Sequence, residues 1–235
     1  MADQVFTPER WRQFWEAFKS EPQQVAGIEE LRQAIAQSDP ALLTESASWV
    51  QNFHKTQPAP AVIKVPYFCQ LQMDDGQGWR DCFSTTAAMI AAWKGKVPPN
   101  TTGENAYNHR RQQHGDSTVA ASQVAALSEL GLQAHYGTNG TKEMLIGLLD
   151  QGIPVGMGVL HHGQVSSPSG GGHWILAVGH DSTGIFANDP YGELGLATGQ
   201  WEQVGKGGDH VHYSFKNLMP RWEVAGGDGY YLWAQ

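Results

Sequence analysis

Cys82 is the residue whose setting in this sequence most directly suggests chemistry. It separates a Gly-rich, charged loop from the apolar stretch "CFSTTAAMIAAW", whose spacing predicts a helix over 82–93. The unpaired backbone N–H groups and the dipole of a helix N-terminus favour a thiolate, the nucleophilic form of cysteine. The competing interpretation is a buried thiol that only packs. We assign that interpretation to Cys69, which lies in the apolar segment "VPYFCQ". A disulfide between the two cysteines, which would consume the thiol, stays open.

A cysteine nucleophile needs a base, and the base needs an orienting group. The chain contains ten histidines, so the candidate base must be selected by its position in the sequence. His173 follows the glycine loop "SPSGGG" and opens an apolar strand, and Asp189 ends the next predicted strand in "ANDPYG". If 174–180 and 185–189 pair across the turn "DSTG", Asp189 lies about one residue pair from His173. Asn188 is the neighbouring alternative, but its side chain would point to the opposite face.

The oxyanion formed on attack at a carbonyl needs a hydrogen-bond donor besides the backbone N–H of Cys82. Three glutamines precede the cysteine, at Gln70, Gln72 and Gln77. Gln70 ends the strand predicted to run beside the nucleophile helix, whereas Gln77 lies in a loop with the composition of a flexible segment. We therefore choose Gln70 as the donor and keep Gln77 as the alternative.

The sequence predicts neither a metal nor a cofactor. His161 and His162 do not form a zinc-ligand spacing with His173, and no carboxylate accompanies them. The pair Asp74-Asp75 has no EF-hand pattern around it. The segments "GQG" and "GGG" lack the strand–loop–helix context and the Lys-Ser/Thr pair of a phosphate-binding loop.

Composition restricts the partners and the compartment. A net charge of −8 argues against nucleic acid, whose phosphates require clustered Lys and Arg. Two cysteines in 235 residues do not make a disulfide framework and fit a reducing compartment. The N-terminal stretch has neither the basic nor the apolar region of a signal peptide, and no apolar run is long enough to span a membrane. We expect cytoplasmic synthesis and no membrane insertion.

The chain divides into two parts at a proline-containing linker, "HKTQPAPAVIKVP". Residues 1–57 are predicted to be helical and to serve targeting, regulation or packing, while 61–235 form the main domain. There "AVIKVPYFCQLQ" is predicted as a strand, and three helices are predicted to end at Gly95, Gly131 and Gly152. Further strands are predicted for the tail from "HVHYSF" onward. Helices followed by a mostly antiparallel sheet indicate an α+β fold.

The chain resembles the papain-like cysteine peptidases, and more closely the bacteriocin-processing (double-glycine) peptidase superfamily with its "peptidase C39-like" phage and bacterial relatives. The stretches that carry the resemblance are "VPYFCQ", "DCFSTTAAMI", "GIPVGMGVLHHGQVSSPSGGGHWILAVGHD" and "NDPYGE". It implies a nucleophile helix packed on an antiparallel sheet. It also implies that Gln70, Cys82, His173 and Asp189 act as oxyanion donor, nucleophile, base and orienting group.

A helical N-terminal region joined to such a domain is similar to stand-alone proteins carried by phages of bacteria. That likeness implies a lysin that hydrolyses peptide bonds of peptidoglycan and reaches the cell wall during lysis. Two other functions stay open on the same fold: a catalytically silent binding module, and an acyl or peptidyl transferase that uses the same thioester. The oligomeric state does not follow from the sequence.

Overall fold

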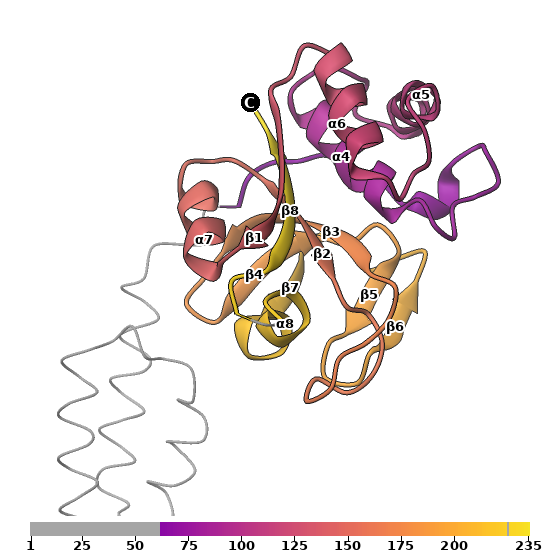
Figure 1. Cartoon of the computed structure of the whole chain (residues 1–235). Helices are drawn as coiled ribbons and strands as arrows, with labels where there is room; N and C mark the ends of the chain where they lie inside the picture. The colour runs from indigo at the N-terminus through magenta and orange to yellow at the C-terminus, as the bar shows by residue number, and fades with distance from the viewer. Residues whose placement is uncertain (1–61, 225) are drawn as a thin grey trace, which may run out of the picture. The chain divides into compact units, whose positions relative to one another are not determined.

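The computed structural model describes residues 62–224 and 226–235 (Figure 1). The helices predicted within 1–57 lie outside the described residues. The described part contains the sheet and the helices that position the candidate site residues.

A six-stranded sheet forms the centre of this part, with the strand order β1-β8-β2-β3-β4-β7. Every neighbouring pair is antiparallel. The strands are β1 (Ala134–Gly140), β2 (Val155–Val159), β3 (His173–His180), β4 (Gly184–Asn188), β7 (Val211–Ser214) and β8 (Gly229–Ala234). A separate hairpin pairs β5 (Gly192–Gly195) with β6 (Gln200–Val204).

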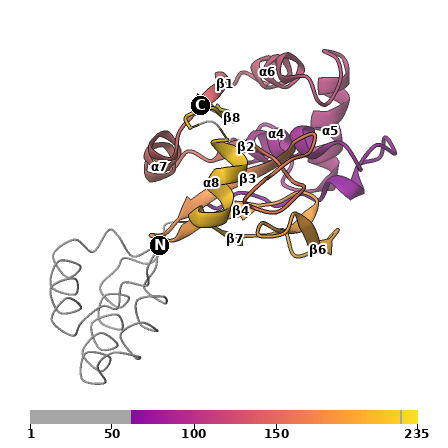
Figure 2. The same cartoon turned by 60° about the horizontal axis from the view of Figure 1, so that its bottom comes forward.

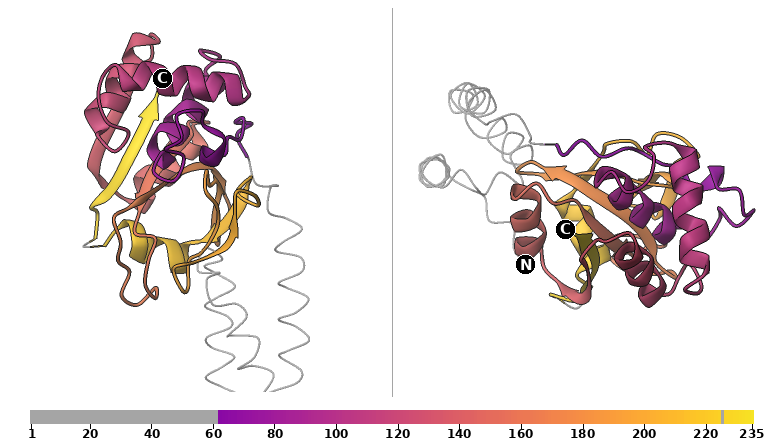
Figure 3. Two further views of the ribbon diagram at one scale, coloured as in Figure 1. Left: turned by 90° about the vertical axis from the view of Figure 1, so that its right-hand side faces the viewer. Right: turned by 90° about the horizontal axis from the view of Figure 1, so that it is seen from above.

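Helices cover both faces of the sheet. One group lies together in Figure 1 and consists of α4 (Cys82–Trp93), α5 (Thr101–Gln112) and α6 (Ala120–Glu129). The others are α7 (Lys142–Asp150) and α8 (Phe215–Trp222). Figure 2 shows α7 apart from the first group, and Figure 3 shows α8, the yellow helix, across the curved sheet from it. The antiparallel sheet with its packed helices confirms the predicted α+β, papain-like class.

The alternation of side chains along β3 divides the core into two clusters. Leu176 and Val178 pack with the buried residues of α4, whereas Ile175 and Ala177 pack with those of α7 and α8. Successive side chains of a strand point to opposite faces, so a strand buried on both faces is apolar throughout. The start of β3 is therefore held rigidly between two packed layers.

Helix α4 is almost entirely buried, although it carries several small and hydroxyl residues. Its buried set runs from Phe83 to Ala92, and the helix packs against β3. Gly95, just beyond its end, has a φ of +68°, a conformation that glycine adopts without strain. Gly131 and Gly152 follow α6 and α7 with φ of +76° and +74°. These three predicted helix ends are confirmed.

The strand predicted for "AVIKVPYFCQLQ" is wrong. Residues 62–69 join no strand, and Gln70–Gln72 form a single 3₁₀ turn. The segment is tied to the sheet locally, because the N–H of Ile63 donates to the carbonyl of Val178 and that of Gln70 to the carbonyl of Pro190. Pro66 has no N–H to donate, which interrupts any continuous ladder.

The tail is not made of strands alone. The predicted alternation holds for β7 and β8, but α8 lies between them at Phe215–Trp222. Phe215, Leu218 and Trp222 are all buried and share one helix face through their i, i+3, i+7 spacing. Pro220 falls near the helix end, where it removes one backbone hydrogen bond. In the described part of the chain, no helix is both long and apolar enough to cross a membrane.

Candidate active site

Cys82 is the first residue of α4, at the place that the sequence predicts. Its thiol is half-buried and free, and Asp81 is the residue immediately before the helix. Cys69 is also a free thiol, 6% exposed, so no disulfide joins the two. Burial comes first among the causes that raise the pKa of the Cys69 thiol. The two cysteines thus differ in the way that the sequence predicts: one opens a helix beside a cavity, and the other is buried.

His173 and Asp189 are brought together by the β3–β4 hairpin. Leu176 lies opposite Asn188 in this pairing, so Asp189 follows at the level of the start of β3. The Nε2 atom of His173 is 2.7 Å from Oδ1 of Asp189, and the two side chains are 5% and 0% exposed. The Asn188 side chain is directed elsewhere, since it donates to the carbonyl of Val65 and accepts from the N–H of His210.

Both carboxylate oxygens of Asp189 have donors of their own. The backbone N–H of Tyr191 donates to Oδ1 at 3.0 Å, and the Tyr213 hydroxyl donates to Oδ2 at 2.8 Å. Tyr213 in turn accepts from the N–H of Leu194 at 2.9 Å, which aligns its own proton with Asp189. We call His173, Asp189 and Tyr213 the His173 cluster. Tyr213 was not predicted, because its strand, β7, has no sequence feature that pairs it with β4.

The His173 imidazole is held in its protonated form. Burial by itself would lower its pKa, but the Asp189 carboxylate and the adjacent Cys82 side chain outweigh that effect and raise the pKa to about 10. Since Nε2 faces Asp189, the other ring nitrogen is the one available to the thiol. A cationic imidazole beside a cysteine can stabilise a thiolate and can later give up a proton.

Gln70 lies in the same cavity as Cys82, whereas Gln77 is not among the residues that line it. The Gln70 side chain is 1% exposed, and its Nε2 donates to the carbonyl of Gly78 at 2.6 Å. A Cβ at Gly78 would overlap the Gln70 carbonyl, so glycine permits this close approach. The Oε1 atom of Gln70 is buried and has no partner.

The cavity around Cys82 has a volume of about 480 Å³ and aromatic walls. Phe83 and Trp174 stack with ring centroids 3.6 Å apart and line both this cavity and a second one of about 380 Å³. On another side, the Trp201 ring meets the His173 ring edge-on at 5.1 Å. The residues around the first cavity are Gln70, Trp79, Arg80, Cys82, Phe83, Thr118, His161, His162, Gly171, Gly172, His173, Trp174, Tyr191 and Trp201.

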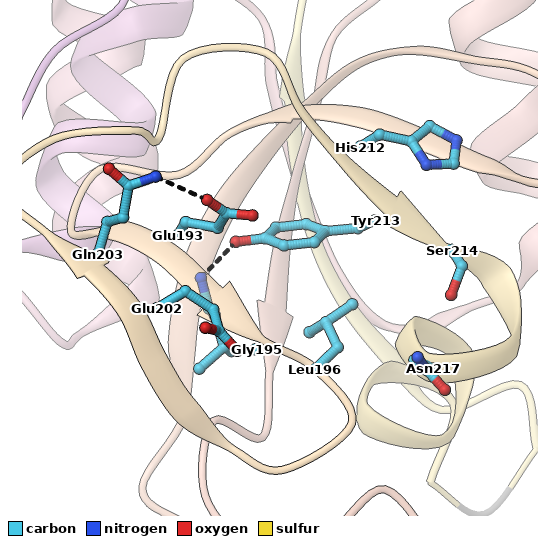
Figure 4. Close-up of a pocket in the computed structure, with 10 residues that line it drawn as sticks. Glu193, Gly195, Leu196, Glu202, Gln203, His212, Tyr213, Ser214 and Asn217 are labelled. Carbon is cyan, nitrogen blue, oxygen red and sulfur yellow. Dashed lines mark hydrogen bonds between the residues drawn. The ribbon is translucent and has the colours of Figure 1, made fainter.

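A third cavity, of about 500 Å³, lies between the β5–β6 hairpin, β7 and α8 (Figure 4). Its walls are polar and include Glu193, Glu202 and His212. Figure 4 shows the Tyr213 hydroxyl directed at the β5 backbone. Neither Cys82 nor His173 lines it, so this third cavity contains none of the site residues predicted from the sequence.

A second buried polar group lies beneath the start of α4. Asp81 and Glu104 are 1% and 0% exposed, and the Thr85 hydroxyl donates to Glu104 at 3.1 Å. Arg111 approaches Asp81 only to 3.9 Å. Oδ2 of Asp81, Oε2 of Glu104 and Nε of Arg111 have no hydrogen-bond partner. Burial raises the pKa of Asp81 to about 6 and that of Glu104 to about 7. We call these four residues the Glu104 cluster.

The histidines that the sequence weighs as metal ligands lie in the cavity. The His161 and His162 rings are 3.9 Å apart between centroids, with their planes tilted by 41°, and the His161 ring is 6.1 Å from that of His173 by the same measure. Within residues 62–224 and 226–235, no three His, Cys, Asp or Glu side chains are grouped to hold a metal ion. Sequence reasoning gave His161 no role of its own.

Comparison with known proteins places the chain in a family. The model of the "Peptidase_C39 like family" matches residues 62–226. Among solved structures, one described as a C39-like peptidase from Bacillus anthracis has a TM-score of 0.50 and 14% identity. A double glycine motif protease from an AMS/PCAT transporter, solved in complex with the leader peptide, has a TM-score of 0.44 and 17% identity. In each comparison 76% of this chain and 98% of the other chain are covered.

The likeness to the Bacillus anthracis structure shows the fold alone. The comparison with curated proteins found no match for this chain. The family match extends over most of the described residues, including α4, β3 and the residue that follows β4. The resemblance stated from the sequence is thereby confirmed at the level of the family. The chain belongs to the Peptidase_C39-like family and is, in general terms, a cysteine peptidase.

Proposed function

We propose that this chain hydrolyses peptide bonds through Cys82, His173 and Asp189. The observation that carries the proposal is the buried 2.7 Å ion pair of His173 with Asp189, on a cavity that also contains the thiol at the start of α4. A positioned nucleophile, an adjacent imidazole and a group that orients the imidazole are the parts that acyl transfer requires.

In the first half of the reaction, the Cys82 thiolate attacks the carbonyl carbon of the substrate. A carbon–sulfur bond forms, the imidazolium of His173 gives its proton to the departing nitrogen, and the carbon–nitrogen bond breaks. In the second half, His173 removes a proton from water, whose oxygen attacks the thioester. The products are a free carboxyl group and the restored thiol.

Gln70 and the backbone N–H of Cys82 stabilise the oxyanion in this proposal. Gln70 borders the cavity, and its buried amide is anchored by one N–H on Gly78, which leaves the second N–H for the substrate oxygen. Gln77 is engaged elsewhere: its backbone N–H donates to Asp75 and its side chain lies against Arg80. The long segment between Gln70 and Cys82 folds as a loop that returns Gly78 to Gln70.

The substrate in this proposal is a peptide, with the stem peptide or cross-bridge of peptidoglycan as its leading identity. Two cavities that share the Phe83–Trp174 pair in their walls can contact several units of an extended chain. The choice of peptidoglycan, and of a phage-type lysin that reaches the wall during lysis, rests on the resemblance to stand-alone phage and bacterial proteins.

Incubation of purified peptidoglycan with the protein tests this proposal. We expect new amino termini, detected by mass spectrometry of the soluble fragments, for the wild type and for Cys69→Ala but not for Cys82→Ala. Loss of the nucleophile should lower the rate by roughly 10⁴-fold or more. Cys69→Ala is the matched control, because it removes the other thiol.

Release of glycan fragments with intact peptides would contradict a peptidase. Iodoacetamide labelling separates the enzyme from a silent binding module: Cys82 should react much faster than Cys69 at pH 6, since burial and a raised pKa protect Cys69. Equal and slow labelling would count against the enzyme. Added amines that appear in the products would instead indicate a transferase.

A further inference from the structure

His161 occupies a place in the cavity that the proposed mechanism does not use. Its ring is 6.1 Å from that of His173 and 6.4 Å from that of Trp201, measured between centroids. It follows β2 on the loop that leads toward the glycine segment, and it borders the same cavity as Cys82. The imidazole therefore stands beside the group that must give a proton to the departing nitrogen.

A buried arginine holds the loop that carries His161. Arg221, which is 0% exposed, donates to the carbonyls of Leu160 at 2.9 Å, His162 at 3.1 Å and Gly163 at 2.6 Å. Its Nε also donates to Leu196 at 2.7 Å. Within the described residues no carboxylate pairs with Arg221; the cation is satisfied by backbone carbonyls. Desolvating a guanidinium is costly, so this arrangement fixes the loop strongly.

The two nitrogens of His161 have different surroundings. Nδ1 is buried without a partner, and a Cβ added at Gly170 would lie 3.3 Å from it. Nε2 is the nitrogen left to the cavity. Because a buried N–H without an acceptor is rarer in proteins than a buried acceptor without a donor, the ring proton belongs on Nε2. Burial, followed by the nearby His162, His173 and Arg221, lowers the pKa of His161 to about 4, so the ring is neutral at ordinary pH.

We propose that His161 is a specificity-determining residue whose Nε2–H donates to an acceptor oxygen, a peptide carbonyl, on the departing side of the substrate. The assignment of that side follows from the mechanism, since the part of the substrate next to the proton donor His173 is the part that leaves. A neutral donor there binds the oxygen without placing a second cation beside the His173 imidazolium. This inference rests on the proposed function.

Two amide substitutions distinguish the two nitrogens. In His161→Gln the side-chain amide nitrogen falls near the position of Nε2, and in His161→Asn near that of Nδ1. When a lost hydrogen bond leaves a buried substrate group unpaired, the reaction rate falls by roughly tenfold to hundredfold. On purified peptidoglycan, measured as released amino groups, His161→Phe and His161→Asn should be slower by that factor, and His161→Gln should recover most of the rate.

The matched probe is p-nitrophenyl acetate, whose leaving group contains no peptide carbonyl. All three variants should hydrolyse it within about twofold of the wild type, because the acyl side and Cys82 are unchanged. His180→Gln is the control substitution, since His180 pairs with Asp150 far along β3. Equal losses on both probes, or no loss on either, would overturn the inference.

A wild type that releases no amino groups from peptidoglycan, while Cys82 still reacts with iodoacetamide, identifies a failure of the proposed function instead. The inference about His161 then falls with it. A wild type that does release amino groups, with His161→Asn as active as His161→Gln, overturns the inference alone and leaves the proposed function standing.

Discussion

The His173 cluster and the Glu104 cluster are both buried, both contain carboxylates and both adjoin Cys82, yet they are paired very differently. In the first, His173 lies 2.7 Å from Asp189, and each oxygen of Asp189 has a donor. In the second, the closest ion-pair approach is 3.9 Å, and one oxygen of Asp81 and one of Glu104 have no hydrogen-bond partner.

The difference between the clusters appears in their protonation. Where charge partners are close, they overcome burial, and the pKa of His173 rises to about 10 so that the cation persists. Where partners are missing, burial dominates, and the pKa of Glu104 rises to about 7 so that the neutral acid persists. In the proposed mechanism the His173 cluster holds the cation that the reaction uses, whereas the Glu104 cluster makes a contribution to stability that depends on pH.

Asp189→Asn should produce the largest effect. Without the negative charge, burial lowers the pKa of His173, and an amide that can also donate to the ring no longer fixes the imidazole tautomer, so kcat should fall by ~10³–10⁴-fold. The corresponding change in the other cluster, Glu104→Gln, should leave kcat within about threefold. Steady-state rates on the peptide substrate measure both, and similar losses in the two variants would abolish the functional distinction between the clusters.

Tyr213→Phe should have an intermediate effect. It removes the hydroxyl that donates to Oδ2 of Asp189 at 2.8 Å, and a hydrogen bond to a charged group contributes about 1.5–3 kcal/mol. We expect roughly a tenfold lower kcat, because Asp189 loses a contact that fixes its carboxylate toward His173, and a shifted pKa in the limb of the pH–rate profile assigned to His173. Tyr107→Phe is the matched control, because Tyr107 is equally buried and bonds to Gln123 instead. A pH–rate profile unaltered by Tyr213→Phe would argue against this role.

Glu104→Gln should change stability rather than rate, and only within a defined pH window. The folded-state pKa values of Asp81 and Glu104 lie above their reference values of 3.8 and 4.5. Their stabilising contribution is therefore fully present below about pH 4 and is lost as the pH rises through 6 to 7. His173 acts in a higher window, since its raised pKa contributes stability below 6.5 that is lost as the pH rises through about 10.

Urea unfolding at pH 5 and pH 7.5 measures that smaller effect. Between these pH values, the free energy of unfolding of the wild type should fall by on the order of 2 kcal/mol more than that of Glu104→Gln. The substituted amide keeps an acceptor for the Thr85 hydroxyl but has no proton to lose. Parallel pH dependences in the two proteins would show that Glu104 does not titrate in this range.

Local sequence was enough to predict the parts of the site that depend on neighbouring residues. The apolar spacing predicts a helix that begins at Cys82. The end of that helix at Gly95 is predictable because glycine readily adopts a positive φ, which is +68° there. The closeness of His173 to Asp189 follows from a hairpin with a short turn, in which register is fixed within one segment of chain. The geometry of these elements depends on residues that are close together in the sequence, so it can be predicted from the sequence.

Features that join distant segments were decided only by the tertiary structure. Tyr213 reaches Asp189 because β7 pairs with β4, and Arg221 reaches the loop of His161 because α8 packs beneath β2. The composition of the segment before Gln70 predicts a strand. In the structure, single hydrogen bonds to β3 and to the loop after β4 hold this segment beside the sheet without a strand. The sequence by itself determined which groups could react; packing across the sheet decided their partners, because periodicity specifies a buried face but not what will cover it.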